Sequence, residues 1–432
     1  MSAFTLGLGG IGAMFVLLLL RQPVWLTLAL VGIAGNIVLN GLPVATMLTG
    51  TSTFDTAGSY ALSVIPLFVL MGEVASGSRM SAELFAAARI FTTGIRGGLS
   101  IASIAASGAF GAICGSSVAT AASMTRIAMP EMQKAGYEDG YSAGSIAAGG
   151  SLGILIPPSI ILVIYGSIAE ASVARLFAAS LIPGIVLMVL YMGVSVVLAG
   201  RAGPPPGAER ITMGQRLLAL LRPWQFMLLF VISIGGIYAG IFSPNEAASV
   251  GAFGAIVIGF LRRTLTVKTF MRALKASVVI SSALFMIIIA ATMFANFVVQ
   301  TRLPDTLLSL AQEANLAPAV VMGLIVAIFI VMGCFLEGIG MVLIMVPVCL
   351  PIVTGFGFDP IWFGVLVAVL VELGLITPPV GMNLFIIKTQ SATLSMGTVF
   401  RGILPFLVAP VVLIILLFAV PQLALWLPDT LY

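Results

Sequence analysis

The chain has 432 residues, of which 60% are hydrophobic and only 8% are charged, and its formal net charge is +4. Soluble domains carry about 25% charged residues, so the composition excludes a soluble protein. Apolar runs of about 20 residues fit helices rather than barrel strands, and they predict an all-α integral membrane protein. The basic residues are scattered between these runs, which argues against a nucleic-acid partner. The sequence has no Walker-type phosphate-binding motif, so we expect neither an ATPase nor an enzyme.

The first half of the chain contains five candidate spans. They are Phe4–Leu20, Trp25–Leu48, Tyr60–Ser76, a broken helix at 141–166, and Leu176–Ala199. The polar stretch Thr49–Ser59 is expected to connect the second span to the third on the outer side. Arg79–Thr93 has apolar residues at helical spacing between charged ones, which is typical of an amphipathic helix at the membrane interface.

A candidate re-entrant hairpin follows at residues 98–132. This segment is too long for a single crossing, and Gly115-Ser116-Ser117 interrupts it in the middle. Each arm has only about 15 residues, which favours a hairpin that returns to the side it entered. The alternative for Gly-Ser-Ser alone is a close helix–helix contact, which small residues serve in membranes.

The second half repeats this order after a proline- and arginine-containing loop at residues 201–223. Its spans are Trp224–Phe242, Ala247–Leu261, Ser277–Val299, a broken helix at 362–388, and Ile403–Leu427. The polar segment Arg302–Asn315 is the second amphipathic segment. A second hairpin covers residues 318–353 and is interrupted between Leu336 and Gly340. We therefore divide the chain into a first repeat at 1–200, a cytoplasmic linker at 201–223 and a second repeat at 224–432.

The broken helices carry nearly the same motif. LGILIPPS begins at Leu152 and LGLITPPV begins at Leu373, 221 residues later. A Pro-Pro pair removes two backbone donors, so carbonyls about one turn upstream lose their helical partners. In hydrocarbon such a carbonyl costs several kcal/mol unless another group satisfies it. Two broken helices at matching positions indicate the binding site of a transporter. The alternative is a pair of proline kinks with no ligand.

The positions of the basic residues predict the orientation. If the N-terminus is periplasmic and both hairpins return to the side they entered, 17 of the 19 basic residues are cytoplasmic, and only Arg175 and Arg302 are external. Five spans per half is an odd number, so the two halves are inverted relative to each other, as alternating-access carriers often are. The hairpins then enter from opposite sides, and their tips meet near the midplane.

The hairpin tips and the helix breaks offer ligands for a cation. Backbone carbonyls and hydroxyls suit Na⁺, and helix N-termini favour a carboxylate. The chain has no histidine, which removes a common proton relay and favours Na⁺ as the driving ion. The symmetry predicts two ion sites, the first from Ser116 and Ser117 with carbonyls around Gly153 and Ile156, the second from Gly338 with those around Gly374 and Thr377.

Four charged residues within apolar segments need an explanation: Glu73, Arg126, Glu337 and Glu372. Arg126 lies nine residues after Ser117, and it either contacts a substrate carboxylate or snorkels to the cytoplasmic interface. Glu337 at the second tip either assists a cation or holds the tip loop together. For Glu372 we expect a neighbouring backbone group as its partner.

Four segments carry a resemblance to a known family. They are Gly115–Met132, Ala147–Gly166, Gly236–Ala252 and Glu372–Phe385. Together they resemble the large membrane subunit, of the DctM or SiaM type, of tripartite ATP-independent periplasmic (TRAP) transporters. The resemblance implies an elevator-type carrier of the ion-transporter superfamily in the bacterial inner membrane. It also implies Na⁺-coupled uptake of an organic acid: a C4-dicarboxylate, sialic acid, a sugar acid or a keto acid.

The resemblance also implies partners and site residues. The partners are a soluble periplasmic substrate-binding protein and a small four-helix membrane subunit, which we expect to be a separate chain. At least two Na⁺ ions and no organic cofactor are expected. The family's Na⁺ sites correspond to Ser116, Ser117, Gly153, Ile156 and Pro158, and to Gly338, Gly374, Thr377 and Val380; substrate contacts are expected at Ser116, Ser117, Arg126 and Gly338. The alternatives are a carrier of the same superfamily that works alone with Na⁺ or protons and, less favoured, a channel.

Overall fold

The computed structural model of the chain describes residues 2–199, 212–334, 336–391 and 394–432, and every regular element in them is a helix. Six of these helices are long and apolar enough to cross a membrane, or up to eight if each of two bent pairs counts as one span. The prediction of an all-helical, multi-span membrane protein is therefore confirmed. Of the predicted linker, residues 201–211 lie outside the described part of the chain.

The helices of the first half follow the predicted order. They are α1 (Ala3–Leu19), α2 (Val24–Ala57), α3 (Val64–Gly77), α4 (Met80–Thr92), α5 (Gly98–Cys114), α6 (Ser117–Lys134), α7 (Asp139–Ser151), α8 (Ile160–Ile168) and α9 (Val173–Ala199). Short 3₁₀ turns precede α3 and follow α7. The chain axis turns by 66° between α3 and α4, so the amphipathic segment does not continue the span before it.

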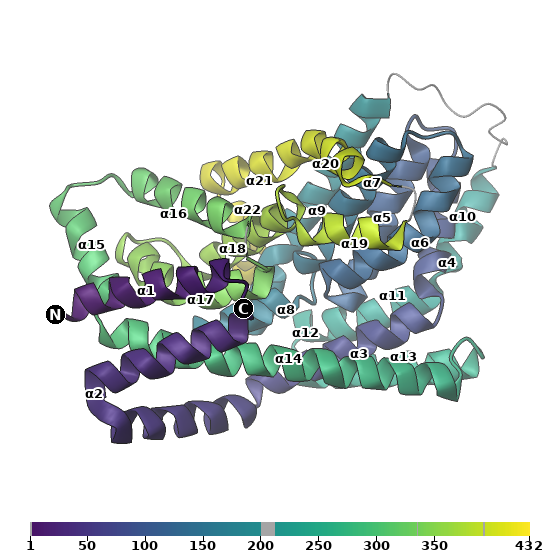
Figure 1. Cartoon of the computed structure of the whole chain (residues 1–432). Coiled ribbons are helices and arrows are strands. Elements are labelled where there is room, and N and C mark those ends of the chain that lie inside the picture. The colour runs from purple at the N-terminus through teal and green to yellow at the C-terminus, as the bar shows by residue number, and fades with distance from the viewer. Residues whose placement is uncertain (1, 200–211, 335, 392–393) are drawn as a thin grey trace.

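The predicted end of the second span is wrong. α2 continues to Ala57, through the expected loop, and breaks instead at Gly41, whose φ is +79°. Glycine tolerates this conformation, and Pro43 lacks the amide that would continue the first arm. Threonine hydroxyls of the second arm donate hydrogen bonds to backbone carbonyls one turn earlier; Thr53 Oγ1, for example, donates to Thr49 O at 2.7 Å. These polar side chains are therefore compatible with a continuous helix. The two arms of α2 form a V (Figure 1).

The helices of the second half are α10 (Met213–Leu221), α11 (Trp224–Phe230), α12 (Gly236–Tyr238), α13 (Pro244–Leu261), α14 (Val267–Gln300), α15 (Leu303–Glu313), α16 (Pro318–Gly333), α17 (Gly338–Gly355), α18 (Pro360–Ile376), α19 (Met382–Gln390), α20 (Met396–Ile403), α21 (Val408–Ala419) and α22 (Gln422–Leu431). A π-helical segment joins α11 to α12. The last predicted span is wrong at both ends. Ser395 caps α20 eight residues before the predicted start at Ile403. α21 ends at Ala419, because Val420 precedes Pro421 and a residue before proline disfavours the helical conformation.

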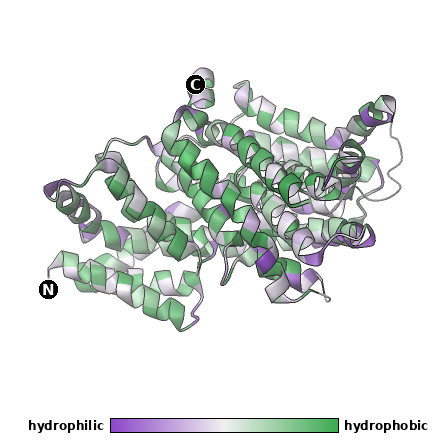
Figure 2. Cartoon of the chain, turned by 90° about the horizontal axis from the view of Figure 1, so that it is seen from above, coloured by the Kyte–Doolittle hydropathy of each residue, from purple (hydrophilic) through white to green (hydrophobic). Residues whose placement is uncertain are grey.

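The two helical hairpins lie at opposite ends of the molecule (Figure 1). α5 and α6 lie at the same end as α4 and α10, whereas α16 and α17 lie at the same end as α15 and the N-terminus. The broken helices lie between them. α18 is the most enclosed helix, since every residue from Ile361 to Ile376 is buried. Figure 2 shows hydrophilic residues mainly near the ends of the molecule and hydrophobic residues along its length, as expected of a chain that crosses a membrane.

Candidate functional site

Both predicted helix breaks are present. In the first, α7 ends in a 3₁₀ turn at Leu152–Ile154, and Ser159 caps the start of α8 by accepting a hydrogen bond from Leu162 N. In the second, α18 ends at Ile376 and α19 starts at Met382. The Pro157–Pro158 and Pro378–Pro379 peptide bonds are both cis. Both copies of the motif therefore interrupt their helix at the Pro-Pro pair, but only the first has a 3₁₀ turn before the pair and a side-chain cap after it.

The tip of the first hairpin lies where the sequence predicts it. α5 ends at Cys114, and Gly115 reverses the chain with a φ of +61°, which glycine adopts without strain. Ser116 caps α6, since its Oγ accepts from Ala119 N at 3.4 Å. The Ser116 carbonyl accepts from the amide and the hydroxyl of Thr120 at 3.1 and 2.8 Å. The polar groups of Ser116 therefore already stabilise the first turn of α6.

This first tip is packed directly against the first helix break. A Cβ placed on Gly111 would lie 2.6 Å from Gly153 Cα, and a Cβ on Gly153 would lie 3.1 Å from Ser116 O. A Cβ on Gly115 would lie 3.0 Å from Pro158 O. A Cβ on Gly111 would overlap the Gly153 backbone, and the positive φ of Gly115 also favours glycine. The structure thus brings Ser116, Gly153 and Pro158 together, as the first predicted ion site requires.

Two carbonyls at the first break lack their ordinary helical donors. Pro157 and Pro158 have no N–H, so neither can bond the carbonyl four residues upstream, on Gly153 or Ile154. The amide of Ile156 does not replace them, because it bonds the carbonyl of Leu152 at 3.0 Å. Ile156 is itself buried, and so is Ser117 on the adjacent tip. The break therefore offers carbonyl oxygens beside the buried hairpin tip.

The second tip starts slightly earlier than the sequence predicts. α16 ends at Gly333 and α17 begins at Gly338, so Gly338 and Gly340 belong to the helix and not to the interruption. A Cβ on Gly338 would lie 2.5 Å from the Val371 side chain, one turn before Gly374 on α18. Gly374 contacts Gly333, since a Cβ placed on Gly374 would lie 2.8 Å from Gly333 Cα. Val380, after the Pro-Pro pair, is 38% exposed.

Thr377 makes the second break chemically different from the first. Its Oγ1 donates to the Leu373 carbonyl at 2.6 Å, and its amide donates to the Gly374 carbonyl at 3.3 Å. In the first copy, Ile156 occupies the equivalent position and has no hydroxyl. The Gly374 carbonyl, which Pro378 leaves without a helical donor, therefore accepts from the Thr377 amide. The equivalent Gly153 carbonyl receives no hydrogen bond from Ile156, whose amide donates to Leu152 O.

The three charged residues near the site differ in exposure and in hydrogen-bond partners. Arg126 is exposed on α6 and has no ion pair among the described residues. Glu337 is at the N-cap of α17 and makes no capping hydrogen bond. The expected backbone partner of Glu372 is wrong, because its Oε1 lies 2.6 Å from the side-chain oxygen of Ser151. That contact joins helices remote in sequence, so no local pattern could predict it.

One further polar side chain at the second break was not assigned a role from the sequence. Asn383, in the first turn of α19, is fully buried, and neither of its amide atoms has a partner within the described part of the chain. An asparagine among apolar residues indicates an intramembrane polar group, but the sequence does not indicate its role. A buried amide without partners retains its full capacity to donate and accept hydrogen bonds.

Comparison with known proteins identifies the family. Residues 11–423 match the family described as "Tripartite ATP-independent periplasmic transporter, DctM component". This chain therefore belongs to the DctM family of TRAP transporters. The family resemblance seen in the sequence is thus confirmed. The DctM-family chain is a multi-pass transporter permease for organic solutes and not an enzyme, and transporters of this family are ATP-independent and ion-coupled.

Several relatives match almost the whole of this TRAP permease. The C4-dicarboxylate TRAP transporter large permease protein DctM of Pseudomonas aeruginosa is 35% identical, over 87% of this chain and 88% of that protein. The sialic acid TRAP transporter large permease protein SiaM of Vibrio cholerae is 31% identical over 98% of both chains. The ectoine/5-hydroxyectoine TRAP transporter large permease protein UehC of Ruegeria pomeroyi is 31% identical, over 96% of this chain and 97% of that protein.

Two solved structures share the fold of this TRAP permease. The Alcanivorax borkumensis YdaH transporter has a TM-score of 0.61 at 14% identity, over 89% of this chain and 90% of that chain. Neisseria gonorrhoeae MtrF has a TM-score of 0.57 at 15% identity, over 89% and 85% of the two chains. At these identities the likeness concerns the fold alone.

Proposed function

We propose that this TRAP permease carries out Na⁺-coupled uptake of a carboxylate-bearing organic acid by an elevator mechanism. The observation that supports this most is the contact of the first hairpin tip with the first helix break. There, glycine contacts bring Ser116 O close to Gly153, whose carbonyl lacks an amide donor from Pro157. Carbonyl oxygens without a donor in hydrocarbon are stabilised by a cation.

The proposed ion sites use backbone oxygens more than side chains. Ser116, Ser117, Gly153, Ile156 and Pro158 would hold one Na⁺, and Gly338, Gly374, Thr377 and Val380 would hold the other. In this proposal the hydroxyl proton of Thr377 goes to Leu373 O, which leaves oxygen lone pairs for a cation. The sites are not equivalent, since the second has a hydroxyl where the first has Ile156.

The proposed substrate position lies between the two tips. Ser116, Ser117 and Gly338 are at the N-termini of α6 and α17, and the positive end of each helix dipole favours a carboxylate. Arg126 is a further proposed contact. Its exposed position on α6, about 13 Å from Ser117 along the helix, suits a substrate that is entering or leaving from that end better than one held at the tip.

We further propose that residues 1–200 and 224–432 are inverted repeats of five spans and one hairpin, in an inner membrane with the N-terminus in the periplasm. In this arrangement the hairpins and broken helices form the mobile transport domain. A periplasmic binding protein delivers the organic acid, and a small membrane subunit completes the scaffold. The relatives named for C4-dicarboxylates and sialic acid support an organic acid as the substrate class.

Uptake into proteoliposomes tests this function. The permease is reconstituted with its small subunit, and a panel of organic acids is offered with the cognate binding protein. Uptake should require inward Na⁺ and should vanish when K⁺ replaces Na⁺ at constant membrane potential. Transport driven by a proton gradient in Na⁺-free buffer would refute Na⁺ coupling. Uptake without the binding protein would favour a carrier that works alone, and downhill flux without any ion gradient would favour a channel.

A further inference from the structure

A cleft lies where α3 and α13 begin, and none of the residues that line it belongs to a helix break or a hairpin tip. Its volume is about 410 Å³. Pockets for organic ligands have volumes of about 300–1,000 Å³, whereas a water molecule takes about 30 Å³, so the cleft has room for an organic group rather than a single ion. One side is polar, with Tyr60, Ser63, Glu246 and Ser249, and the other is apolar, with Leu67, Ile241, Phe242 and Val250.

The two walls of the cleft are held together by one buried amide. Asn245, in the first turn of α13, is 7% exposed, and its Nδ2 donates to the carbonyl of Tyr60 and to Ser63 Oγ. The second of these bonds is 3.1 Å long. Both amide protons are therefore used to join the start of α13 to the segment that leads into α3. The cleft is formed in the structure without a ligand.

The serine hydroxyls of the cleft can only accept hydrogen bonds from a ligand. Ser63 Oγ donates to Tyr60 O at 2.7 Å, and Ser249 Oγ donates to Asn245 O at 2.9 Å. A backbone carbonyl has no proton, so in both bonds the hydroxyl must be the donor. Each hydroxyl has one proton and two lone pairs, and Ser63 uses one lone pair for the amide of Asn245. Both serines therefore retain a lone pair and no proton.

Glu246 adds a carboxylate oxygen to these acceptors. Its Oε2 accepts from Ser243 N at 2.8 Å and from Ser243 Oγ at 2.9 Å, within the capping box of α13. Its Oε1 has no hydrogen-bond donor among the described residues, and the side chain is exposed, where a glutamate is ionised at neutral pH. Glu246 and Ser249 are three residues apart on α13 and so lie on the same face of the helix.

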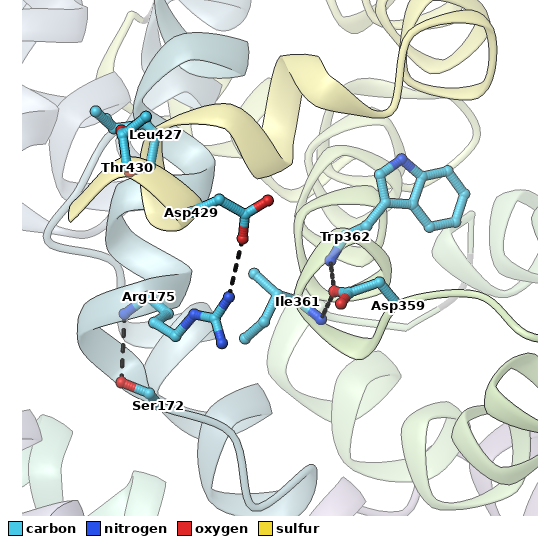
Figure 3. Close-up of polar contacts among 8 residues, drawn as sticks. All are labelled: Ser172, Arg175, Asp359, Ile361, Trp362, Leu427, Asp429 and Thr430. Atoms are coloured by element: carbon cyan, nitrogen blue, oxygen red, sulfur yellow. Dashed lines mark hydrogen bonds and ion pairs between the residues drawn. The ribbon is translucent and has the colours of Figure 1, made fainter. Parts of the chain in front are cut away.

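The chain supplies no cation to this carboxylate. Among the described residues that line the cleft, none is basic. The preceding helix α12 contacts α9, where Tyr238 Oη donates to Phe177 O at 3.0 Å. Arg175 lies two residues before Phe177, but it forms an ion pair with Asp429 of α22 at 3.1 Å (Figure 3). The cleft therefore has one negative charge and an excess of acceptors, and its complement is a cation that donates hydrogen bonds.

We propose that this cleft binds the primary ammonium headgroup of a phospholipid such as phosphatidylethanolamine. The three N–H groups of the ammonium match three acceptors, Glu246 Oε1, Ser63 Oγ and Ser249 Oγ, while the apolar side of the cleft contacts the glycerol and the start of an acyl chain. A lipid rather than a soluble amine is the occupant, because α13 is long and apolar enough to cross a membrane and its start lies near a bilayer surface. Tyr60 is 70% exposed beside the cleft, and tyrosine is enriched at that depth.

A series of lipids that differ only in N-methylation tests the proposal on the unmodified protein. The thermal midpoint of the purified full-length permease in detergent is measured with phosphatidylethanolamine, its N-methyl and N,N-dimethyl forms and phosphatidylcholine, all with the same acyl chains. A lipid that binds the folded state raises the midpoint in proportion to its occupancy. Each methyl group removes one N–H, so the apparent affinity should fall at each step, by about tenfold or more over the series. Equal shifts across the series would overturn the proposal, and so would an equal shift with free ethanolamine.

Matched variants locate the site. E246Q keeps the capping box, because glutamine also serves at that position, but it removes the charge that faces the ammonium. It should lose the preference for phosphatidylethanolamine over phosphatidylcholine, and S249A should reduce it. E313Q, at an exposed carboxyl on α15 outside the cleft, should keep it. A preference that persists in E246Q would place the lipid elsewhere.

The same titration with the small membrane subunit present distinguishes a lipid from a protein partner. If the permease alone prefers phosphatidylethanolamine but the complex does not, a lysine of the small subunit occupies the cleft, and the lipid proposal is wrong. The proposal expects the same preference in both preparations. None of these readouts depends on uptake or on Na⁺, so their failure is distinguishable from a failure of the proposed transport function.

Discussion

Gly111 and Gly153 meet backbone to backbone, and this contact seats the first hairpin arm on the first helix break. A Cβ on Gly111 would lie 2.6 Å from Gly153 Cα and 3.0 Å from Gly153 N, and backbone atoms cannot rotate away as a flexible side chain can. The equivalent contact in the second half joins Gly333 to Gly374. Both hairpins thus contact their broken helices directly through backbone atoms.

We expect Gly111→Ala to destabilise the permease. Alanine favours an isolated helix over glycine by about 1 kcal/mol, but overpacking against a fixed backbone costs about 1–3 kcal/mol, so the clash should win. The thermal midpoint in detergent and uptake should both fall. Gly193→Ala on α9 is the matched control, because nothing lies within 4 Å of its added Cβ. It should be neutral or stabilising. Equal effects of the two substitutions would contradict the importance of the contact.

Ser151 and Glu372 should show energetic coupling. We expect Ser151→Ala and Glu372→Met to destabilise the protein singly, and the double variant to lose less than the sum, because both remove the same hydrogen bond. Hydrogen bonds between membrane helices average about 0.6 kcal/mol and reach about 1.7 kcal/mol, which sets the expected coupling energy. Reversible unfolding of the four proteins in mixed micelles measures it. Additive losses would mean that the two side chains act independently.

The features that the sequence predicted correctly depend on local chemistry. Pro157-Pro158 and Pro378-Pro379 cannot continue a helix in any surroundings, so the two breaks follow from the residues alone. Gly115 likewise marks the first tip, because a tight reversal between two apolar arms needs a residue that tolerates positive φ. The family resemblance rests on these same segments.

The features that the sequence missed depend on tertiary contacts or on weak local signals. Gly41 lies two residues before Pro43, but this signal is weak, because Pro183 lies inside the continuous helix α9. The threonine-rich second arm of α2 was predicted to be a loop, because a sequence does not show that the threonine hydroxyls donate hydrogen bonds to backbone carbonyls of the same helix. The contact of Ser151 with Glu372 needs the two halves to pack together, although its 221-residue offset was a signal that a search of repeat-equivalent polar pairs could have used.

The proposed orientation predicts opposite labelling at the two ends of the molecule. Asn315 follows α15 and Met213 begins α10, and both are exposed. α15 and α10 lie at opposite ends of the molecule (Figure 1). In a variant with its three cysteines replaced, a membrane-impermeant maleimide added to intact cells should label Asn315→Cys and not Met213→Cys. Both should react after permeabilisation. The reverse pattern would invert the orientation, and labelling of both sites in intact cells would place them on one side.

Thr377→Val should raise the Na⁺ concentration needed for half-maximal uptake. Valine keeps the β-branched shape and removes the oxygen, so packing should barely change while a proposed ligand is lost. The hydroxyl proton is directed to Leu373 O at 2.6 Å, which leaves the oxygen's lone pairs available to a cation. The deficit should shrink as Na⁺ is raised, because mass action refills a weakened site.

Thr377→Ser is the matched control for this substitution, since it retains the hydroxyl and should keep the Na⁺ requirement near that of wild type. If the hydroxyl serves only to satisfy the Leu373 carbonyl, Thr377→Val should instead lower expression or the thermal midpoint and leave the Na⁺ dependence of the surviving protein unchanged. Uptake measured over a range of Na⁺ concentrations, at matched amounts of reconstituted protein, separates the two roles. An unchanged Na⁺ requirement in well-expressed Thr377→Val would remove this residue from the ion site, and the second site would then consist of backbone carbonyls alone.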